Sequence, residues 1–395
     1  MKKIMGVILI SSLLLLVGTS SYAQASGVDT NSIDIFLQEK MREGGLPCLS
    51  LGIVKDGETL YYKTYGDKYS RNAGDSELIF PIGSISKTFT ALAIRQLINR
   101  AELKENAPVN DYLPGFTTMY QGNEATVTIG QLITHTSGIS KLTGGAPYTY
   151  NTFYSLEKVV EKSMNITLAH SPGERYEYSN MNYILLGRIL EIITGQSYSE
   201  YIREHIIEPL GMKNTIAGIS QLQDRKYYHG YQPLYGAVTP VIYPFSTGNA
   251  PSGGVFSTAK DLCLWISLYQ KGGYVNGISL IDNNPISPMG SEQICYDIYW
   301  VPMYKTQNLV INHNGSYPGY SSSMTMDITS GYGVVILANS FDQMGVFSQG
   351  PTPWSMTEEI LTYLNTGKFP EQTRTVWNYT PLAWMLFLLI TVIIL

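Results

Sequence analysis

Residues 81–98 of this chain read PIGSISKTFTALAIRQLI. From Phe89 to Ile98 the apolar residues cover nearly every side of a helix, which is typical of a buried helix. Ser84 and Lys87 come just before this run and lie three residues apart, so a helix beginning here would carry both on one face. A hydroxyl is a poor nucleophile at neutral pH, but the positive end of a helix favours its alkoxide. The stretch therefore predicts a nucleophilic Ser84, assisted by Lys87, at the start of a buried helix.

The Ser-x-x-Lys spacing is not specific by itself, because Ser155 to Lys158 and Ser257 to Lys260 match it too. A second short motif, Tyr178-Ser179-Asn180, comes just before an amphipathic helical run from Tyr183 to Ile193. Tyr-x-Asn is also common, since residues 274–276 and 363–365 fit it. The order of the motifs along the chain and the longer strings around them therefore have to decide which matches carry chemistry.

A third motif, His313-Asn314-Gly315, lies between a strand-like run at 309–311 and a second strand expected near 322–326. Four longer strings accompany the three motifs: Leu132-Ile133-Thr134-His135-Thr136-Ser137-Gly138, Pro172-Gly173 before Tyr178, Ser252-Gly253-Gly254-Val255-Phe256-Ser257-Thr258, and Gly315-Ser316-Tyr317-Pro318-Gly319-Tyr320-Ser321. In this order they resemble the class C β-lactamase family, which also includes serine D-peptidases, penicillin-binding proteins and esterases. The resemblance extends from about residue 33 to about residue 364.

The resemblance implies a role for each motif residue. The serine matching Ser84 is acylated, and the tyrosine matching Tyr178 acts as base or proton shuttle. The lysine matching Lys87 lowers the effective pKa of that tyrosine, since a phenol near pKa 10 is stabilised as phenolate by an ammonium within a few ångströms. Which of Lys87 and Tyr178 takes the proton in each step stays open. The resemblance also implies an oxyanion hole from the backbone N–H groups of Ser84 and Ser316, with Asn180 holding the substrate's amide.

His313, with Gly315 and Ser316, is expected to line the substrate site. In the family that this chain resembles, dedicated β-lactamases have Lys-Thr-Gly in place of His313-Asn314-Gly315. The lysine there supplies a fixed positive charge for a substrate carboxylate. A histidine near pKa 6.5 is mostly neutral at pH 7, so we expect it to recognise carboxylates better as the pH falls toward 6. His135 is assigned a structural role. The other histidines have no metal-like spacing, and we expect no metal or cofactor.

Both ends of the chain are apolar. Lys2 and Lys3, the apolar run from Ile4 to Val17 and small residues near position 25 predict a signal peptide over 1–25, with an N-terminal membrane anchor as the alternative. Residues 376–395 have no charge and carry aromatics at their near edge, and about 20 such residues can cross a bilayer. We expect a transmembrane segment there. The sequence stops inside this apolar run, which suggests a longer form of the chain that continues with more helices. A C-terminal core helix is the alternative. The catalytic part would then lie outside the cytoplasm, anchored to the membrane.

Composition excludes other classes of protein. The chain has 26 Lys and Arg against 31 Asp and Glu, a net charge of -5 without basic clusters, which argues against a nucleic-acid partner. Its three cysteines, Cys48, Cys263 and Cys295, are too few and too scattered for a disulfide framework or a zinc site.

Periodicity predicts an α/β domain over 26–370. The expected elements are a helix at 31–43, strands at 48–55 and 59–65 joined by the hairpin dipeptide Asp56-Gly57, strands near 300–303, 308–313, 321–327 and 334–338, and a final helix at 354–365. These ends would form one antiparallel sheet flanked by helices. A mostly helical insertion, about 101–250, splits the domain and includes helices near 129–134, 155–164, 182–194 and 198–207. The cleft between the two parts is the expected site.

These observations predict an exported, membrane-tethered serine hydrolase that forms an acyl-enzyme. The family resemblance implies that it acts on a small peptide or acyl-peptide and cleaves next to a D-amino acid. Its layout also resembles the peptidases that remove an acyl-D-amino-acid leader from non-ribosomal products such as precolibactin. This chain keeps the general pattern, Asn180 and Gly319, so that leader specificity does not transfer. A β-lactamase, a cell-wall carboxypeptidase and an esterase remain alternatives. A non-catalytic wall- or partner-binding protein is the alternative of another class, although it has no need of Ser84, Lys87 and Tyr178 together.

Overall fold

The computed structural model describes residues 28–66, 79–145, 151–222, 227, 229–234, 237–241, 245–275, 277–281, 301–303, 309–341 and 351–371. The predicted signal peptide, the predicted transmembrane segment at 376–395 and Cys295 lie outside these ranges. Within the ranges, no helix combines the length and the apolar character that a membrane crossing requires. Cys48 and Cys263 are buried.

One antiparallel sheet organises the molecule, as the sequence predicts. Its strand order is β12-β13-β14-β15-β1-β2. The strands are β12 (Val301–Met303), β13 (Val310–Tyr317), β14 (Tyr320–Asp327), β15 (Tyr332–Ala338), β1 (Leu49–Lys55) and β2 (Glu58–Tyr65). The predicted hairpin between β1 and β2 turns at Asp56 and Gly57, which have φ angles of 50° and 79°. Two successive positive φ values are the signature of the tight turn that suits the twist of a hairpin.

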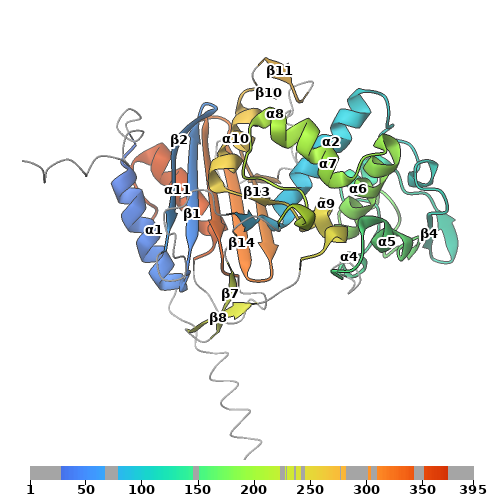
Figure 1. Cartoon of the computed structure of the whole chain (residues 1–395), viewed down its shortest axis with the longest axis horizontal. Coiled ribbons are helices and arrows are strands. Elements are labelled where there is room, and N and C mark those ends of the chain that lie inside the picture. The colour runs from blue at the N-terminus through green and yellow to red at the C-terminus, as the bar shows by residue number, and fades with distance from the viewer. Residues whose placement is uncertain are drawn as a thin grey trace, which may run out of the picture.

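Helices cover both faces of the sheet. The helices α1 (Thr30–Gly44) and α11 (Pro353–Thr366) pack on one face, and α10 (Ala259–Gln270) packs on the other (Figure 1). Successive residues of a strand point to opposite faces. In β15 this places Val334 and Ile336 in the core under α1 and α11, whereas Val335 and Leu337 belong to the core under α10. β15 is therefore buried on both sides, which explains its nearly continuous apolar sequence.

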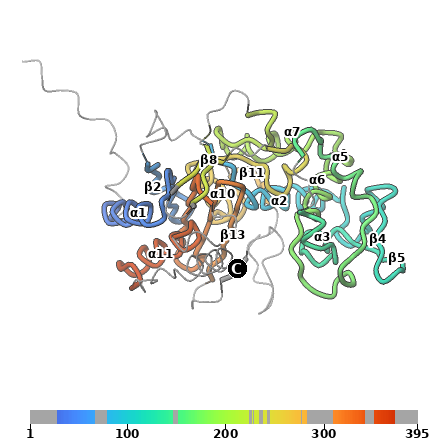
Figure 2. The backbone as a smooth tube through the Cα atoms, turned by 90° about the horizontal axis from the view of Figure 1, so that it is seen from below, coloured from blue at the N-terminus to red at the C-terminus, as the bar shows by residue number. Residues whose placement is uncertain are grey.

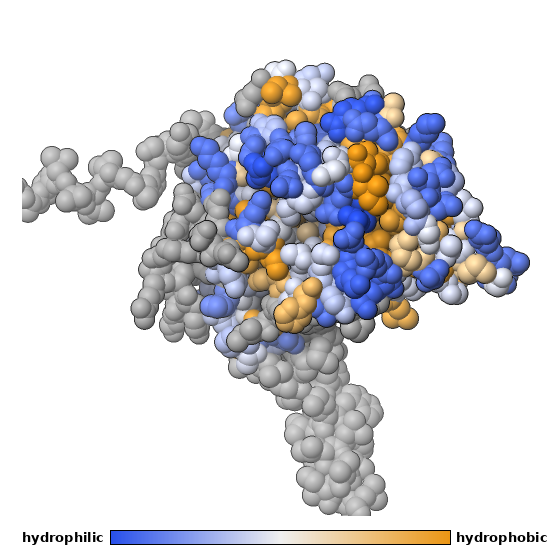
Figure 3. All heavy atoms as spheres, turned by 45° about the vertical axis from the view of Figure 1, so that its right-hand side comes forward, coloured by the Kyte–Doolittle hydropathy of each residue, from blue (hydrophilic) through white to orange (hydrophobic). Residues whose placement is uncertain are grey.

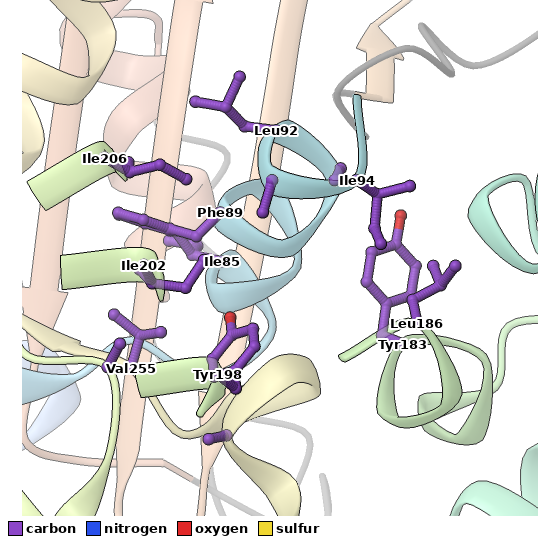
Figure 4. Close-up of a cluster of buried hydrophobic side chains, with 14 of the residues drawn as sticks. Ile85, Phe89, Leu92, Ile94, Tyr183, Leu186, Tyr198, Ile202, Ile206 and Val255 are labelled. Atoms are coloured by element: carbon purple, nitrogen blue, oxygen red, sulfur yellow. The ribbon is translucent and has the colours of Figure 1, made fainter. Parts of the chain in front are cut away.

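The helix that the opening stretch predicts is α2 (Ser86–Asn99). Its residues from Ser86 to Ile94 are all buried, in agreement with the nearly all-round apolar pattern. The helix packs against α6 (Asn180–Thr194), α7 (Tyr198–Ile202) and α9 (Ala250–Gly253). Figure 4 shows Phe89 of α2, and Ile85 just before the helix, beside Ile202, with Tyr183 on the other side of the helix. Lys87 is thus surrounded by protein because the first nine residues of its helix are buried.

Smaller elements complete the middle of the chain. The helices are α3 (Ile129–Ile133), α4 (Lys141–Gly144), α5 (Leu156–Glu161) and α8 (Glu208–Leu210), and the strands are β3 (Phe80–Pro81), β4 (Thr117–Tyr120), β5 (Asn123–Ala125), β6 (Asn165–Thr167), β7 (Gly230–Leu234), β8 (Ala237–Val241), β9 (Phe256–Ser257), β10 (Tyr274–Val275) and β11 (Ile278–Ser279). The predicted helices appear within a few residues of their expected bounds. The three-stranded sheet β5-β4-β6 is not part of the sequence prediction, because its strands are only three or four residues long.

The helical part lies at the opposite end of the molecule from α1 and α11 (Figure 2). On the face drawn in Figure 3, hydrophobic residues form several separate groups among hydrophilic ones. Isolated apolar side chains at the surface are ordinary in soluble domains. The turn that carries Ser84 lies where the helical part meets β13 and β14 of the sheet.

Candidate active site

Ser84 lies in a single 3₁₀ turn, Gly83–Ile85, directly before α2. The sequence places it at the helix start, whereas α2 itself begins two residues later, at Ser86. The turn lies against β13. Gly83 has φ 52°, and a Cβ there would lie 2.5 Å from the carbonyl oxygen and 2.6 Å from the nitrogen of Ser316. A glycine is required because both the backbone angle and the contact exclude a side chain.

The Ser84 hydroxyl touches two other predicted catalytic groups. Its Oγ lies 2.6 Å from the Tyr178 hydroxyl oxygen, and Lys87 Nζ donates to it over 3.2 Å. Either hydroxyl can be the donor in the first contact. Tyr178 comes from the residue pair before α6, so two segments nearly a hundred residues apart meet at one oxygen. A nucleophile with two potential proton carriers within hydrogen-bond reach is the geometry that covalent catalysis needs.

Lys87 is fully buried, and its ammonium has three oxygen acceptors. It donates to Asn180 Oδ1 over 2.8 Å and to the Ser252 carbonyl over 2.6 Å, besides its contact with Ser84. Its Nζ also lies 4.8 Å from the centre of the Tyr178 ring. Burial lowers the pKa of Lys87 well below its ordinary value. The three acceptors oppose that effect, because hydrogen bonds to oxygen favour the charged form. Lys87 is thereby poised to exchange a proton with its neighbours.

The other two Ser-x-x-Lys matches have structural roles. Ser155 caps α5, where its Oγ accepts from the Lys158 backbone N–H over 3.2 Å. The Ser257 hydroxyl lies 2.8 Å from the Thr215 hydroxyl, and Lys260 Nζ lies over the Tyr62 ring. Three-dimensional neighbours therefore distinguish Ser84 from these serines, as the longer sequence strings suggest.

The His313-Asn314-Gly315 motif lies within β13, where the sequence suggests a connection between strands. β13 continues to Tyr317, so position 315 pairs with Ser322 and position 316 with Ser321. A Cβ on Gly315 would lie 2.0 Å from the Ile82 carbonyl oxygen. The absent side chain lets the Ser84 turn pack directly on the strand. Ser316, one residue further, is exposed at the pocket.

His313 is only 4% exposed, and its Nδ1–H donates to the Asn314 carbonyl over 2.9 Å. Burial, together with the positive charge of Lys87, lowers its pKa to about 3. The prediction that His313 gains a positive charge near pH 6 is therefore wrong, because it assumed a solvent-exposed ring. Its predicted contact with substrate stays a prediction, since the ring is not among the residues that line the pocket.

A pocket opens beside Ser84. Its lining residues are Ser84, Gly145, Asn180, Asn249, Ser252, Gly253, Ser316, Tyr317, Pro318 and Phe341. None of these ten carries a formal charge. Sequence reasoning assigned no role to Gly145, Asn249, Ser252 or Phe341. The family string that begins at Ser252 could have indicated that this segment lies at the site. The Ser252 group that binds Lys87, however, is a backbone carbonyl, which any residue type could supply.

A serine in contact with a tyrosine and a buried lysine, beside a sheet edge, defines the active-site arrangement of a serine hydrolase. A family model described as Beta-lactamase matches residues 33–352. The chain therefore belongs to the β-lactamase family, whose members are serine hydrolases. Among the described residues, no group of three or more His, Cys, Asp and Glu side chains could hold a metal ion.

Individual relatives agree with this family. Protein flp of Staphylococcus aureus (strain MW2) is 32% identical over 313 residues, which is 78% of this chain and 62% of that protein. Penicillin-binding protein 4* of Bacillus subtilis (strain 168) is 28% identical over 72% of this chain and 66% of its own length. The chain thus spans less than two thirds of the length of these curated relatives. The octameric penicillin-binding protein homologue from Pyrococcus abyssi has a TM-score of 0.67 at 28% identity, covering 87% of this chain and 79% of its own.

Proposed function

We propose that this chain is an exported, membrane-tethered serine peptidase that cleaves an amide next to a D-amino acid through an acyl-enzyme on Ser84. The observation that carries the proposal is the position of the Ser84 hydroxyl, 2.6 Å from the Tyr178 hydroxyl and 3.2 Å from Lys87 Nζ. The substrate is a small peptide or acyl-peptide, such as a cell-wall peptide or an acyl-D-amino-acid leader. The solved structures with TM-scores of 0.67 and 0.63 that are titled D-amino acid amidase and D-stereospecific amidohydrolase are about 21% identical, so they support the fold alone.

The chemistry follows from this arrangement. Ser84 Oγ bonds to the carbonyl carbon of the substrate, and its proton passes to the Tyr178 and Lys87 pair. That proton goes to the departing nitrogen as the C–N bond breaks, which leaves an ester on Ser84. Water then attacks the ester and releases the acid, and the serine regains its proton by the reverse route. The backbone N–H groups of Ser84 and Ser316 stabilise the negative oxygen in both steps.

Covalent labelling with a fluorophosphonate or a fluorescent penicillin tests the acyl-enzyme. Ser84→Ala should abolish labelling while the protein stays folded, because it removes one oxygen from a turn whose packing depends on Gly83. Ser155→Ala and Ser257→Ala are matched controls and should label normally. A folded wild-type protein that takes no label would favour a non-catalytic binding protein. Loss of label in either control with retention in Ser84→Ala would place the nucleophile elsewhere.

The proposed leaving group is tested with matched D and L substrates. A peptide amide, the corresponding free acid and an ester, each with D or L configuration next to the scissile bond, separate peptidase, carboxypeptidase, β-lactamase and esterase activity. We expect higher kcat/KM for the D amide than for its L isomer. We also expect the neutral amide to be preferred to the free acid, since the ten lining residues are uncharged and His313 is neutral. A preference for the free acid would favour a carboxypeptidase or a β-lactamase, and a lack of amide hydrolysis would favour an esterase.

Membrane tethering rests on the composition of residues 1–25 and 376–395. The full chain, expressed in bacteria and fractionated, should sediment with membranes and be cleaved by protease added outside spheroplasts. A chain ending at 371 should lose the membrane association and retain labelling. Recovery of both forms in the soluble cytoplasmic fraction would contradict export and tethering.

A further inference from the structure

His135 lies directly behind the Tyr178 ring. It follows α3 in the Thr134-His135-Thr136 turn, with φ 55°, a backbone angle that few residues other than glycine adopt. Its side chain is fully buried. The imidazole stacks on the Tyr178 ring with 4.7 Å between ring centres and 26° between ring planes. A flat ring held at an unusual backbone angle is thus in contact with the proposed proton carrier.

The same imidazole also holds the backbone on which Tyr178 is carried. Its Nδ1 accepts from the Ser179 N–H over 3.1 Å and from Asn182 Nδ2 over 2.9 Å. The Ser137 hydroxyl donates to Asn182 Oδ1 over 2.8 Å, which turns the amide so that its NH₂ faces the imidazole. Because Nδ1 accepts two hydrogen bonds, the ring proton belongs on Nε2 and the ring is neutral.

The surroundings keep the ring neutral. The ionisable groups that face it are Lys87 from α2, His313 from β13 and the phenols of Tyr176, Tyr178 and Tyr183. Burial is the main cause that holds the pKa of His135 well below its ordinary value, and the charge of Lys87 acts in the same direction. A protonated ring would lose its acceptor and would release the Ser179 N–H.

We propose that His135 is a positioning residue that fixes the Tyr178-Ser179-Asn180 segment against Ser84 and Lys87. The stack sets the position of the Tyr178 ring, and the bond to the Ser179 N–H sets the peptide between the two functional side chains. The inference rests on the proposed function, because that function gives Ser84, Lys87 and Tyr178 their catalytic task. It assigns the histidine of the Thr-His-Thr-Ser-Gly turn a role in orienting the catalytic groups, in addition to its place in the core.

Two substitutions of His135 separate the effect of its hydrogen-bond acceptor from the effect of its ring stack on Tyr178. His135→Asn keeps an oxygen at the δ position and tolerates the positive φ, but it removes the stack. His135→Phe keeps a flat ring and removes the acceptor. Since a displacement of about 1 Å can cost about 100-fold in rate, we expect His135→Phe to acylate about 100-fold more slowly and His135→Asn to stay within about 10-fold of wild type. Labelling rates are measured on folded protein, checked by circular dichroism.

Tyr198→Phe is the matched control for lost buried hydrogen bonding. It removes a hydroxyl 2.8 Å from Thr90 Oγ1, and Tyr198 packs on the other side of α2 from Tyr183 (Figure 4). This control should lose stability and keep the wild-type labelling rate.

In a Tyr178→Phe background, His135→Phe should reduce the residual labelling rate by less than about 3-fold, because the hydroxyl that His135 positions is already absent. Equal losses in both backgrounds, or a His135→Phe rate equal to that of wild type, would overturn the proposal.

A second measurement does not depend on catalysis. In ¹⁵N-histidine NMR spectra, His135 should show a protonated Nε2 and an unprotonated Nδ1 from pH 5.5 to 8, and His135→Phe should shift the Ser179 amide resonance more than His135→Asn does. If wild type takes no label, the proposed function fails, yet these spectra still decide whether the imidazole holds the segment. A titrating His135, or an Nδ1–H tautomer, would refute it.

Discussion

Lys87 shows how a single buried charge is accommodated at the residue scale. Three oxygens, from Ser84, Asn180 and the Ser252 carbonyl, lie within 3.2 Å of its Nζ. A buried ammonium without such partners would be strongly destabilising. Each acceptor comes from a different part of the chain, so the charge both depends on the assembled fold and holds its parts together at the nucleophile.

Lys87 and Tyr178 should act as one unit, because both contact the same Ser84 oxygen. We expect the double variant Lys87→Met with Tyr178→Phe to have little less activity than the worse single variant. Acylation rates of the four proteins, measured with one ester substrate, form the cycle. Losses that simply multiply would indicate independent roles and contradict a shared proton path.

At the scale of elements, the active site depends on how closely the Ser84 turn approaches β13. The missing side chain of Gly315 leaves room for the Ile82 carbonyl, which also accepts from the Ser322 hydroxyl over 2.9 Å. The turn is thus bonded to β14 and packed on β13. This contact brings the turn that carries Ser84 against the strand that carries Ser316, the two residues proposed to form the oxyanion hole.

We expect Gly83→Ala and Gly315→Ala each to destabilise the fold by more than about 2 kcal/mol and to reduce kcat/KM by about 100-fold, because a Cβ at either position must separate turn and strand. Gly195→Ala is the control for backbone strain. Its φ is 69°, and a Cβ there would meet nothing within 4 Å. It should cost about 1 kcal/mol and leave kcat/KM unchanged. Urea unfolding and steady-state kinetics provide both measurements, and full activity in Gly315→Ala would show that the close approach is dispensable.

At the scale of the whole molecule, two buried neutral histidines connect folding to pH. His135 and His313 both have depressed pKa values, that of His313 being about 3. Such a group takes up its proton more readily in the unfolded chain. Its contribution to stability is therefore complete above the unfolded pKa of about 6.5 and is lost as the pH falls toward the folded pKa.

His313 alone should accordingly lower the free energy of unfolding by about 2 kcal/mol between pH 7.5 and pH 5, and His135 should add to this decrease. His313→Asn should remove about 2 kcal/mol of the decrease, whereas the exposed His229→Asn should leave it unchanged. Urea midpoints at several pH values measure the effect. A decrease of the same size in His313→Asn would mean that other groups control the acid sensitivity. The ratio of kcat/KM for the free-acid substrate to kcat/KM for the amide should also stay constant in wild type from pH 5.5 to 8, because His313 stays neutral over this range.

The sequence by itself predicted the main elements of this protein and singled out Ser84 as its candidate nucleophile. The apolar pattern after Ser84 predicted α2, Asp56-Gly57 predicted the first hairpin, and the strand-like runs near both ends of the domain predicted one antiparallel sheet. These features are local, because helix and strand periods and turn angles involve residues close in sequence. The family strings added the order of the motifs, which selected Ser84 from three similar serines.

Only the tertiary structure decided the environment of each side chain. Lys87 meets the Ser252 carbonyl 165 residues away, and a backbone acceptor leaves no mark in residue type. His313 appeared solvated in the sequence, whereas the sheet and the helical part bury it and lower its pKa to about 3. The stack of His135 on Tyr178 likewise joins two distant turns. Burial, charge and orientation depend on groups brought together from remote parts of the chain, and therefore no local pattern could specify them.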